Sequence, residues 1–234
     1  MEFYGIDLGW TGKPSGLARM EWDGKRLELR ECTRLATHAE VLQVIPECGA
    51  AWIGLDAPVR IGNASGMREA DREAHQLFSK QHAGCYPVNR GMPFAGKVLE
   101  FVAKLEKLGF STEPAGERQI ETRQLFEVYP HAASIRLFGL EQILPYKKGR
   151  IEERREALLE FRRLLAGGLA SRRPSFCSEV LIMPGQGARE LKACEDQLDA
   201  VLCAYIAAHY WYWGLARNNI LGQVAEGWIV NPSF

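Results

Sequence analysis

Short apolar runs separated by turn residues dominate the first third of the chain, as expected for β-strands. The first run covers residues 3–8 and the second covers 16–22. The dipeptide Asp23-Gly24 favours a hairpin turn, and residues 25–32 then alternate between apolar and polar positions. This pattern predicts a meander of three antiparallel strands. Residues 51–55 are nearly all apolar, which predicts a fourth strand covered on both faces.

Beyond the meander, the apolar positions follow the longer period of helices, with one further strand among them. Residues 58–122 are rich in Gly, Pro, Arg and Asn, and we interpret them as an insert or lid within a single domain that spans 1–234. The remaining elements are expected to be strands at 124–129 and at the edge of the sheet at 227–230, and helices at 37–45, 68–79, 97–108, 132–137, 151–165 and 194–213.

The order of these elements limits the fold class. Three antiparallel strands are followed by parallel strands that connect through helices, and such crossovers place helices on both faces of a mixed sheet. We therefore predict an α/β protein with the RNase H-like arrangement of three antiparallel strands and then parallel strands, interrupted by a helical insert.

Composition and charge narrow the class of protein. Hydrophobic residues make up 47% and charged residues 25% of the chain, values typical of a soluble globular protein and unlike those of disordered or collagen-like chains. The 29 Lys and Arg residues balance the 29 Asp and Glu residues. A protein that coats nucleic acid or a membrane surface would be basic, so any nucleic-acid contact must come from a local patch.

The remaining compositional features predict a cytoplasmic protein without membrane association. The six cysteines contain no C-x-x-C pair, which argues against a zinc site and favours free thiols in a reducing compartment. The N-terminus lacks the basic and apolar regions of a signal peptide. The longest apolar stretch, residues 200–214, is interrupted by His209 and is shorter than the roughly 20 residues of a membrane span.

Three acidic residues lie in or directly after predicted strands. Asp7 has apolar neighbours, Asp56 follows the fourth strand, and Glu127 lies inside the fifth. Burying a lone carboxylate costs several kcal/mol, and acids on neighbouring strands also repel one another. Because a divalent cation resolves both problems, we predict that these acids are catalytic residues and ligands of Mg²⁺ or Mn²⁺.

The last predicted helix adds Asp196 and Asp199, which project from nearly one face at this spacing. Both are candidate metal ligands. Asp199, which borders the apolar stripe of the helix, is also a candidate catalytic residue. Two metal ions about 4 Å apart, held by carboxylates, hydrolyse phosphodiester bonds without a side-chain nucleophile. The absence of any plausible Ser-His-Asp or Cys-His set agrees with this chemistry.

Each acid also has a structural interpretation, which the sequence leaves open. An Asp at the end of a strand can start a turn, and a buried Glu can pair with an arginine. Acids near a helix N-terminus interact favourably with the helix dipole. The pattern shared by all five acids is what favours the catalytic interpretation.

Several motifs add an independent indication. They are GIDLGW at 5–10, GLDAP at 54–58, Arg68-x-x-Asp71-Arg72, FEVYPHAA at 126–133, Lys147-Lys148, DQLDAVLCAY at 196–205 and GWIVNP at 227–232. In this order they resemble the domain-of-unknown-function 429 family, described as predicted RNase H-like nucleases. The resemblance implies an RNase H-like fold with the acids of the site at Asp7, Asp56, Glu127 and Asp199.

Four further residues are candidates for substrate binding. Lys148 belongs to a basic turn before a charged helix, Arg90 lies in a loop of the insert, and Arg68 begins the first insert helix. Such side chains contact phosphate groups. His131 stands where the resembled family often has an acid, and it is a candidate metal ligand or general acid. The basic turn and the histidine also have structural interpretations, as ion-paired and capping residues.

We therefore expect metal-dependent phosphodiester hydrolysis, with nucleic acid or another phosphorylated molecule as the substrate. One alternative is an ATP-dependent phosphotransferase of the actin-like or sugar-kinase type, since residues 7–12 loosely resemble a phosphate loop. Another is a non-catalytic binding module of the same fold. The aromatic run at 210–213 and the apolar segment 227–230 are expected to lie in the core or, where exposed, to form a homodimer interface.

Overall fold

Eight strands form one mixed sheet in the computed structural model, which describes residues 1–178 and 181–233. β1, β2 and β3 are antiparallel neighbours, whereas β4, β5 and β8 run parallel to β1. The order across the sheet is β6-β3-β2-β1-β4-β5-β8-β7. The predicted meander followed by parallel strands is therefore confirmed. The strands are β1 (Glu2–Asp7), β2 (Ser15–Trp22), β3 (Leu27–Leu35), β4 (Ala51–Leu55), β5 (Arg123–Val128), β6 (Phe176–Cys177), β7 (Asn218–Gln223) and β8 (Gly227–Pro232).

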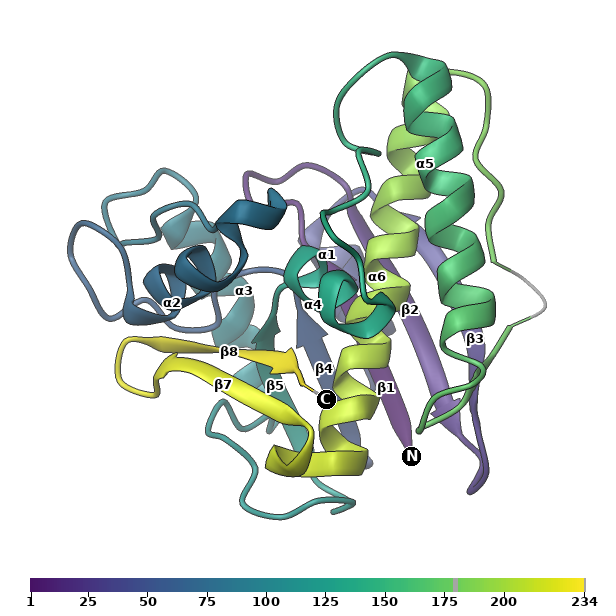
Figure 1. The fold of residues 1–234 in the computed structure, drawn as a ribbon. Helices are drawn as coiled ribbons and strands as arrows, with labels where there is room; N and C mark the ends of the chain where they lie inside the picture. Colours follow the sequence, from purple (N-terminus) through teal and green to yellow (C-terminus); the bar gives the residue numbers. More distant parts are fainter. Residues whose placement is uncertain (179–180, 234) are drawn as a thin grey trace.

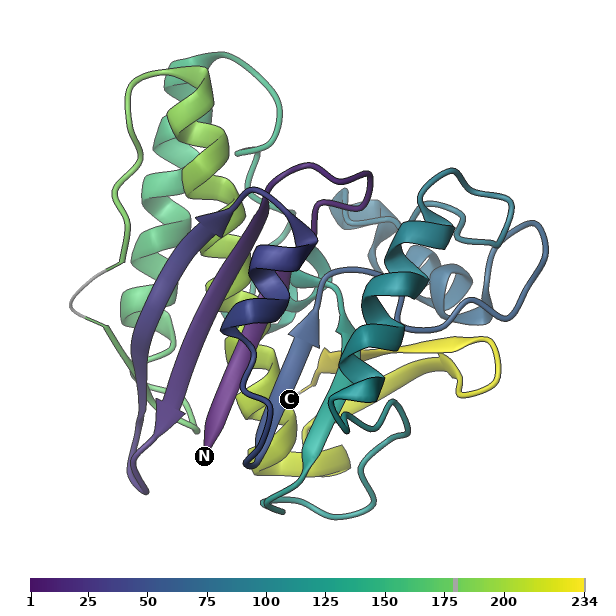
Figure 2. The same ribbon diagram turned by 180° about the vertical axis from the view of Figure 1, so that it is seen from behind.

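Helices cover both faces of this sheet, which confirms the predicted α/β class. In Figure 1, α4, α5 and α6 lie in front of the sheet, and Figure 2 shows α1 and α3 on the opposite face. The segment between β4 and β5 contains α2, η1 and α3. The helices are α1 (His38–Val44), α2 (Glu69–Phe78), α3 (Ala95–Lys107), α4 (Pro130–Phe138), α5 (Ile151–Arg163) and α6 (Ala188–Trp213), with short helical turns η1 (Ser79–Gln81), η2 (Leu164–Gly168) and η3 (Gly214–Ala216).

Side-chain alternation divides the core into two layers. Phe3 of β1 and Trp52 of β4 pack with α6, whereas Tyr4 and Ile53 pack with α1 and α3. Successive side chains of a strand point to opposite faces, so the residues two and four positions after Phe3 and Trp52 also face α6. These positions are occupied by Gly5, Asp7, Gly54 and Asp56.

Glycines on the sheet let α6 lie close against it. A Cβ at Gly5 would overlap the carbonyl oxygen of Ala200, and a Cβ at Gly16 would overlap the carbonyl oxygen of Asp196. Glycine in a strand often marks such a close approach of another backbone. The residues of α6 from 196 to 200 are therefore held directly over β1 and β2, beside the end of β1.

α6 begins at Ala188, earlier than the predicted start near residue 194. The carboxylate of Glu190 explains the difference, because it accepts the backbone N–H of Gly187 (3.0 Å) and so caps the helix. Asp196 and Asp199 therefore lie inside the helix, and an interaction with its N-terminus does not account for them. Within residues 1–178 and 181–233, neither α6 nor any other helix combines the length and apolar character needed to cross a bilayer.

The C-terminal strand differs from its prediction, because β8 lies between β5 and β7 and all its residues are buried. The aromatic run at the end of α6 is also largely internal. The ring of Trp211 lies 5.4 Å from that of Phe3, and the ring of Tyr210 lies 5.5 Å from that of Trp52. Strand β7, which the sequence pattern did not reveal, covers the outer side of β8. These contacts bury β8 and the first half of the aromatic run, while Tyr212 and Trp213 are half-buried, and the homodimer stays a prediction.

Replacing Gly5 by alanine should destabilise the protein by about 1–3 kcal/mol, because the new methyl group overlaps backbone atoms of α6. Gly96 in α3 is a matched control, since a Cβ built there meets no atom within 4 Å. Alanine at that helical position should stabilise the protein by up to about 1 kcal/mol. Urea unfolding followed by circular dichroism measures both effects. Equal free energies of unfolding for the two variants would contradict the close approach of α6.

Candidate functional site

The carboxyl ends of two neighbouring parallel strands bring Asp7 and Asp56 together. β1 and β4 pair in register as far as Ile6 and Leu55. The backbone N–H of Asp56 donates to the carbonyl oxygen of Ile6 (2.8 Å). Nε1 of Trp10 donates to the carbonyl oxygen of Asp56 (2.8 Å) and so fixes the loop after β1 against the end of β4. Both aspartates are half-buried on the α6 side of the sheet.

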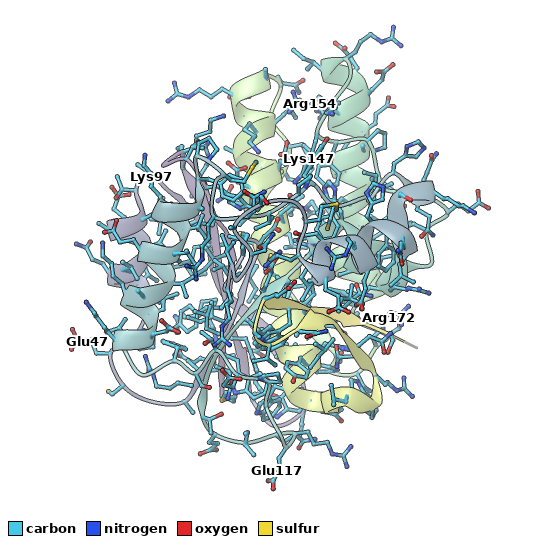
Figure 3. The ribbon with its side chains drawn as sticks, turned by 90° about the vertical axis from the view of Figure 1, so that its left-hand side faces the viewer. Glu47, Lys97, Glu117, Lys147, Arg154 and Arg172 are labelled. Atoms are coloured by element: carbon cyan, nitrogen blue, oxygen red, sulfur yellow. The ribbon has the colours of Figure 1, made fainter. Side chains whose placement is uncertain are left out.

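α6 contributes a third carboxylate, that of Asp199, which is fully buried. The hydroxyl of Tyr146 donates to its Oδ1 (2.7 Å), and Nζ of Lys147 lies 3.0 Å from its Oδ2. Both partners come from the loop between α4 and α5. The ring of Tyr146 stacks on Phe161 of α5 with 5.1 Å between centroids, which anchors this loop. Figure 3 shows Lys147 toward the middle of the molecule, close to α6, whereas Glu47 lies at its periphery.

The three aspartates share the ammonium of Lys147. Burial raises the pKa of Asp7 well above its usual range, and repulsion by Asp199 and Asp56 adds to the shift. Burial raises the pKa of Asp56 to about 7, despite the attraction of Lys147. Burial also opposes the ionisation of Asp199, but Lys147 and the hydroxyl of Tyr146 help to hold its pKa below the usual value. Asp199 is therefore the ionised member of the set, while Asp7 and Asp56 retain protons at higher pH than ordinary aspartates.

Glu127 was predicted to join this set but lies on the other face of the sheet. It pairs in register with Leu55, whose side chain packs with α3, so its carboxylate points away from α6. Arg68 binds both oxygens of Glu127 through Nη1 and Nη2, each at 2.7 Å. Nη2 of Arg68 also donates to Oδ1 of Asp71 (2.7 Å). Burial raises the pKa of Glu127, although Arg68 opposes the shift.

These contacts give several predicted site residues a structural role. Arg68 is fully buried, and its guanidinium donates to two carboxylates and a carbonyl oxygen, so it does not face a substrate. The oxygens of Asp196 accept from Nε of Arg34 (2.7 Å) and Nζ of Lys192 (2.8 Å). Asp196 thus has two basic partners, whereas Glu127 shares the single charge of Arg68 with Asp71. We therefore do not retain Arg68 as a substrate contact, or Asp196 and Glu127 as metal ligands.

A pocket of about 990 Å³ lies between the α2 region and the loop that follows α4. None of the three aspartates lines it, but Lys147 connects it to Asp199. The lining of the pocket includes His131 and Lys147, both of which interact electrostatically with Asp199. Lys148 also lines the pocket. Arg90 lies elsewhere in the segment between β4 and β5, where its Nε donates to a backbone carbonyl oxygen (2.9 Å). Two of the four residues predicted to bind substrate, Lys148 and His131, therefore converge on one pocket.

Asp7 and Asp56 offer hard oxygen donors to a divalent cation. Within residues 1–178 and 181–233, no basic side chain forms a direct ion pair with either carboxylate. In the same ranges, no three His, Cys, Asp or Glu side chains are already arranged as a metal site. The donor set nonetheless fits the preference of Mg²⁺ and Mn²⁺ for carboxylate oxygens. A cation at this point would offset the burial and repulsion that raise the pKa values of both aspartates.

The comparison with known proteins bears on the whole site. A family model described as Protein of unknown function (DUF429) matches residues 5–219. The chain belongs to this family. The part matched to the DUF429 model includes Asp7, Asp56 and Asp199 and all the motifs named above except the one at 227–232, and the family resemblance is thereby confirmed. Searches of curated proteins and of solved structures gave no match.

Sequence reasoning missed the roles of Tyr146 and Lys147. Lys148 was the predicted phosphate contact, yet its neighbour Lys147 forms the ion pair with Asp199. The available signal was an aromatic residue directly before the polar turn 147–150 and after the apolar residues Leu144 and Pro145. A tyrosine there is expected to be buried with its hydroxyl bonded, and the residue that follows it then lies near the core.

Replacing Arg68 by alanine should lower the free energy of unfolding by about 3–5 kcal/mol, because Glu127 and Asp71 would be left buried without a counter-charge. Replacing Arg26 by alanine is the control, since it removes only solvent-exposed pairs with Glu28 and Asp23, which contribute little to stability. Urea unfolding distinguishes the two. Similar losses for both variants would show that the buried arginine does not stabilise the fold.

The raised pKa of Asp56 links stability to pH. Its pKa is about 7 in the folded protein and about 3.9 in an unfolded chain. The folded state therefore binds this proton more tightly, and ionisation of Asp56 reduces stability as the pH rises between these values. The melting temperature of Asp56→Asn relative to wild type should rise from pH 4 to pH 8 in metal-free buffer.

The control for this pH series is Asp23→Asn. The carboxyl of Asp23 is exposed, and the backbone N–H groups of Arg26 and Lys25 lower its pKa. Its contribution to stability therefore has the opposite sign, and the melting temperature of the control relative to wild type should not rise over the same range. A constant difference for Asp56→Asn would mean that Asp56 titrates as an ordinary aspartate.

Proposed function

We propose that the protein hydrolyses phosphodiester bonds of nucleic acid with the help of Mg²⁺ or Mn²⁺. The observation that supports this most directly is the gathering of Asp7, Asp56 and Asp199 from β1, β4 and α6 around the ammonium of Lys147. Hydrolysis assisted by a metal ion needs carboxylates held in this way and no side-chain nucleophile.

The sheet topology supports the same proposal. The order β3-β2-β1-β4-β5, with an antiparallel meander followed by parallel strands, is the order expected of an RNase H-like fold. The aspartates of β1 and β4 lie at the carboxyl ends of adjacent parallel strands, where ligands of open α/β sheets usually bind. Fold alone does not assign an activity, so the proposal depends on the carboxylates.

Each residue of the candidate site would have its own role in the proposed hydrolysis. Asp7 and Asp56 would hold a divalent cation, which supplies Lewis acidity and a water of lowered pKa when bound. Oδ1 of Asp199 accepts from the hydroxyl of Tyr146, and its Oδ2 forms an ion pair with Lys147 (3.0 Å) but accepts no hydrogen bond among the described residues. The Lys147 ammonium would thus supply one positive charge at Asp199, where the sequence led us to expect a second metal ion. Lys147 would interact with a phosphate oxygen, and Asp199 would orient Lys147.

The six cysteines are all free thiols. This fits the reducing cytoplasm that we propose as the location of the activity.

The test is cleavage of labelled single-stranded, duplex, hybrid and branched nucleic acids with Mg²⁺ or Mn²⁺. Asp7→Asn should reduce the rate by more than about a hundredfold, because loss of a supporting residue behind a metal ligand already costs up to that factor. Asp23→Asn replaces an exposed aspartate in the β2–β3 turn and should leave the rate unchanged. Mn²⁺ should also raise the melting temperature of wild type but not of Asp7→Asn.

Three outcomes would contradict the proposal. Equal cleavage by Asp7→Asn and wild type would place the activity at another site or in a contaminant. ATP turnover that depends on an acceptor, without any cleavage, would favour a phosphotransferase. No reaction of either kind, together with no effect of Mn²⁺ on melting, would indicate a binding module.

A further inference from the structure

The pocket beside the aspartates has a lining of one charge sign. Its charged residues are Lys147, which pairs with Asp199, and Lys148. It also contains His75, His82 and His131, and because burial lowers the pKa of His131 to about 4, that histidine adds a neutral ring. No Asp or Glu belongs to this lining within the described ranges, although acidic and basic residues are equal in number over the whole chain. A concave surface with cations and without carboxylates attracts an anionic ligand.

The same pocket presents aromatic rings. Tyr86, whose side chain is 80% exposed, lies at its wall, as does Tyr129. The rings of Tyr129 and His131 lie 6.0 Å apart at an angle of 31°. Tyr129 is half-buried, whereas the exposed ring of Tyr86 is of the kind that stacks on nucleobases whatever the base. Nε2 of His131 is buried without a hydrogen-bond partner among the described residues, so a polar atom is left for a ligand.

Size limits what the pocket can hold. Its volume of about 990 Å³ lies at the upper end of the roughly 300–1,000 Å³ of small-molecule sites. Such a pocket admits a nucleotide unit. A base that is paired and stacked in a duplex must first be extruded to enter a pocket of this kind.

We infer that this pocket binds an unpaired nucleotide of the substrate, with the base against Tyr86 and Tyr129 and the phosphate at Lys148 and Lys147. The inference rests on the proposed function and specifies its substrate class as a strand end or another single-stranded segment. Lys147 belongs both to the pocket and to the ion pair with Asp199. A phosphate bound there is therefore held next to Asp199, at a lysine that also attracts Asp7 and Asp56.

Calorimetric titration with nucleoside 5′-monophosphates, in buffer with EDTA and no divalent cation, tests the pocket separately from catalysis. The monophosphates should bind more tightly than the corresponding nucleosides or inorganic phosphate, because only they engage both the rings and the lysines. Lys148→Glu should weaken binding by roughly tenfold or more, as expected for loss of a hydrogen bond to a charged group. Lys25→Glu, in the distant exposed β2–β3 turn, makes the same charge change and should leave the affinity unchanged.

A second pair of variants tests whether the base stacks on the ring of Tyr86. Tyr86→Ala should weaken binding of the monophosphates by roughly fivefold to a hundredfold, the range for loss of one stacked base contact. Tyr86→Phe keeps the ring and should bind like wild type. Because Tyr86 is largely exposed, neither change is expected to unfold the protein. Circular dichroism checks that both variants remain folded.

The outcomes separate this inference from the proposed function. No saturable binding up to about 5 mM monophosphate, or equal affinities for Lys148→Glu and Lys25→Glu, would overturn the pocket assignment even if the enzyme cleaves duplexes. Monophosphate binding that is lost in Lys148→Glu and retained in Asp7→Asn would support it even if no cleavage is found. Preference for single-stranded over duplex substrates would support both proposals, whereas a preference for blunt duplexes would count against the inference alone.

Discussion

The close approach of α6 to the sheet determines the geometry of the site. Gly5 and Gly16 leave room for the helix backbone at Ala200 and Asp196. One residue before Ala200, Asp199 is thereby held beside the end of β1, where Asp7 faces the same side of the sheet. A larger side chain at Gly5 would push the helix away and separate these carboxylates. Packing of backbone against backbone therefore brings together acids that lie far apart in the sequence.

The acids of this protein compensate for their burial in two different ways. Glu127 and Asp71 share the guanidinium of Arg68, which binds both through short hydrogen bonds. Removal of a charge from such a buried set is strongly destabilising, so these residues belong to the framework. Asp7 and Asp56 form no direct ion pair within the described residues. Lys147 attracts both at longer range, Lys192 also attracts Asp56, and burial raises their pKa values. Unbalanced charge of this kind is more typical of functional sites than of stabilising networks.

The sequence was sufficient for the fold class and for the juxtaposition of Asp7 and Asp56, because both stand at the ends of apolar segments that pair as neighbours. The sequence was less reliable where a shift of one position moves a side chain to the opposite face of the sheet. Glu127 lies between Phe126 and Val128, whose side chains pack with α6, so alternation places the glutamate on the opposite face. Applying the period of two from the ends of all three strands would have separated Glu127 from the aspartates. The partnership of Asp199 with Tyr146 could not be predicted, because it depends on tertiary packing of the loop before α5.

In the proposed reaction, the aspartates repel the negatively charged substrate, and the lysines of the neighbouring pocket offset this repulsion. Three aspartates repel a phosphodiester, and a neutral protein supplies no general attraction for nucleic acid. The lysines of the pocket supply a local attraction, and Lys147 both lines the pocket and pairs with Asp199. Its ammonium offsets part of the negative charge of the aspartates and is also placed to meet a phosphate oxygen. If the pocket alone attracted the substrate, the affinity of the protein for nucleic acid would depend on a few phosphate contacts. Added salt would then lower that affinity only gently.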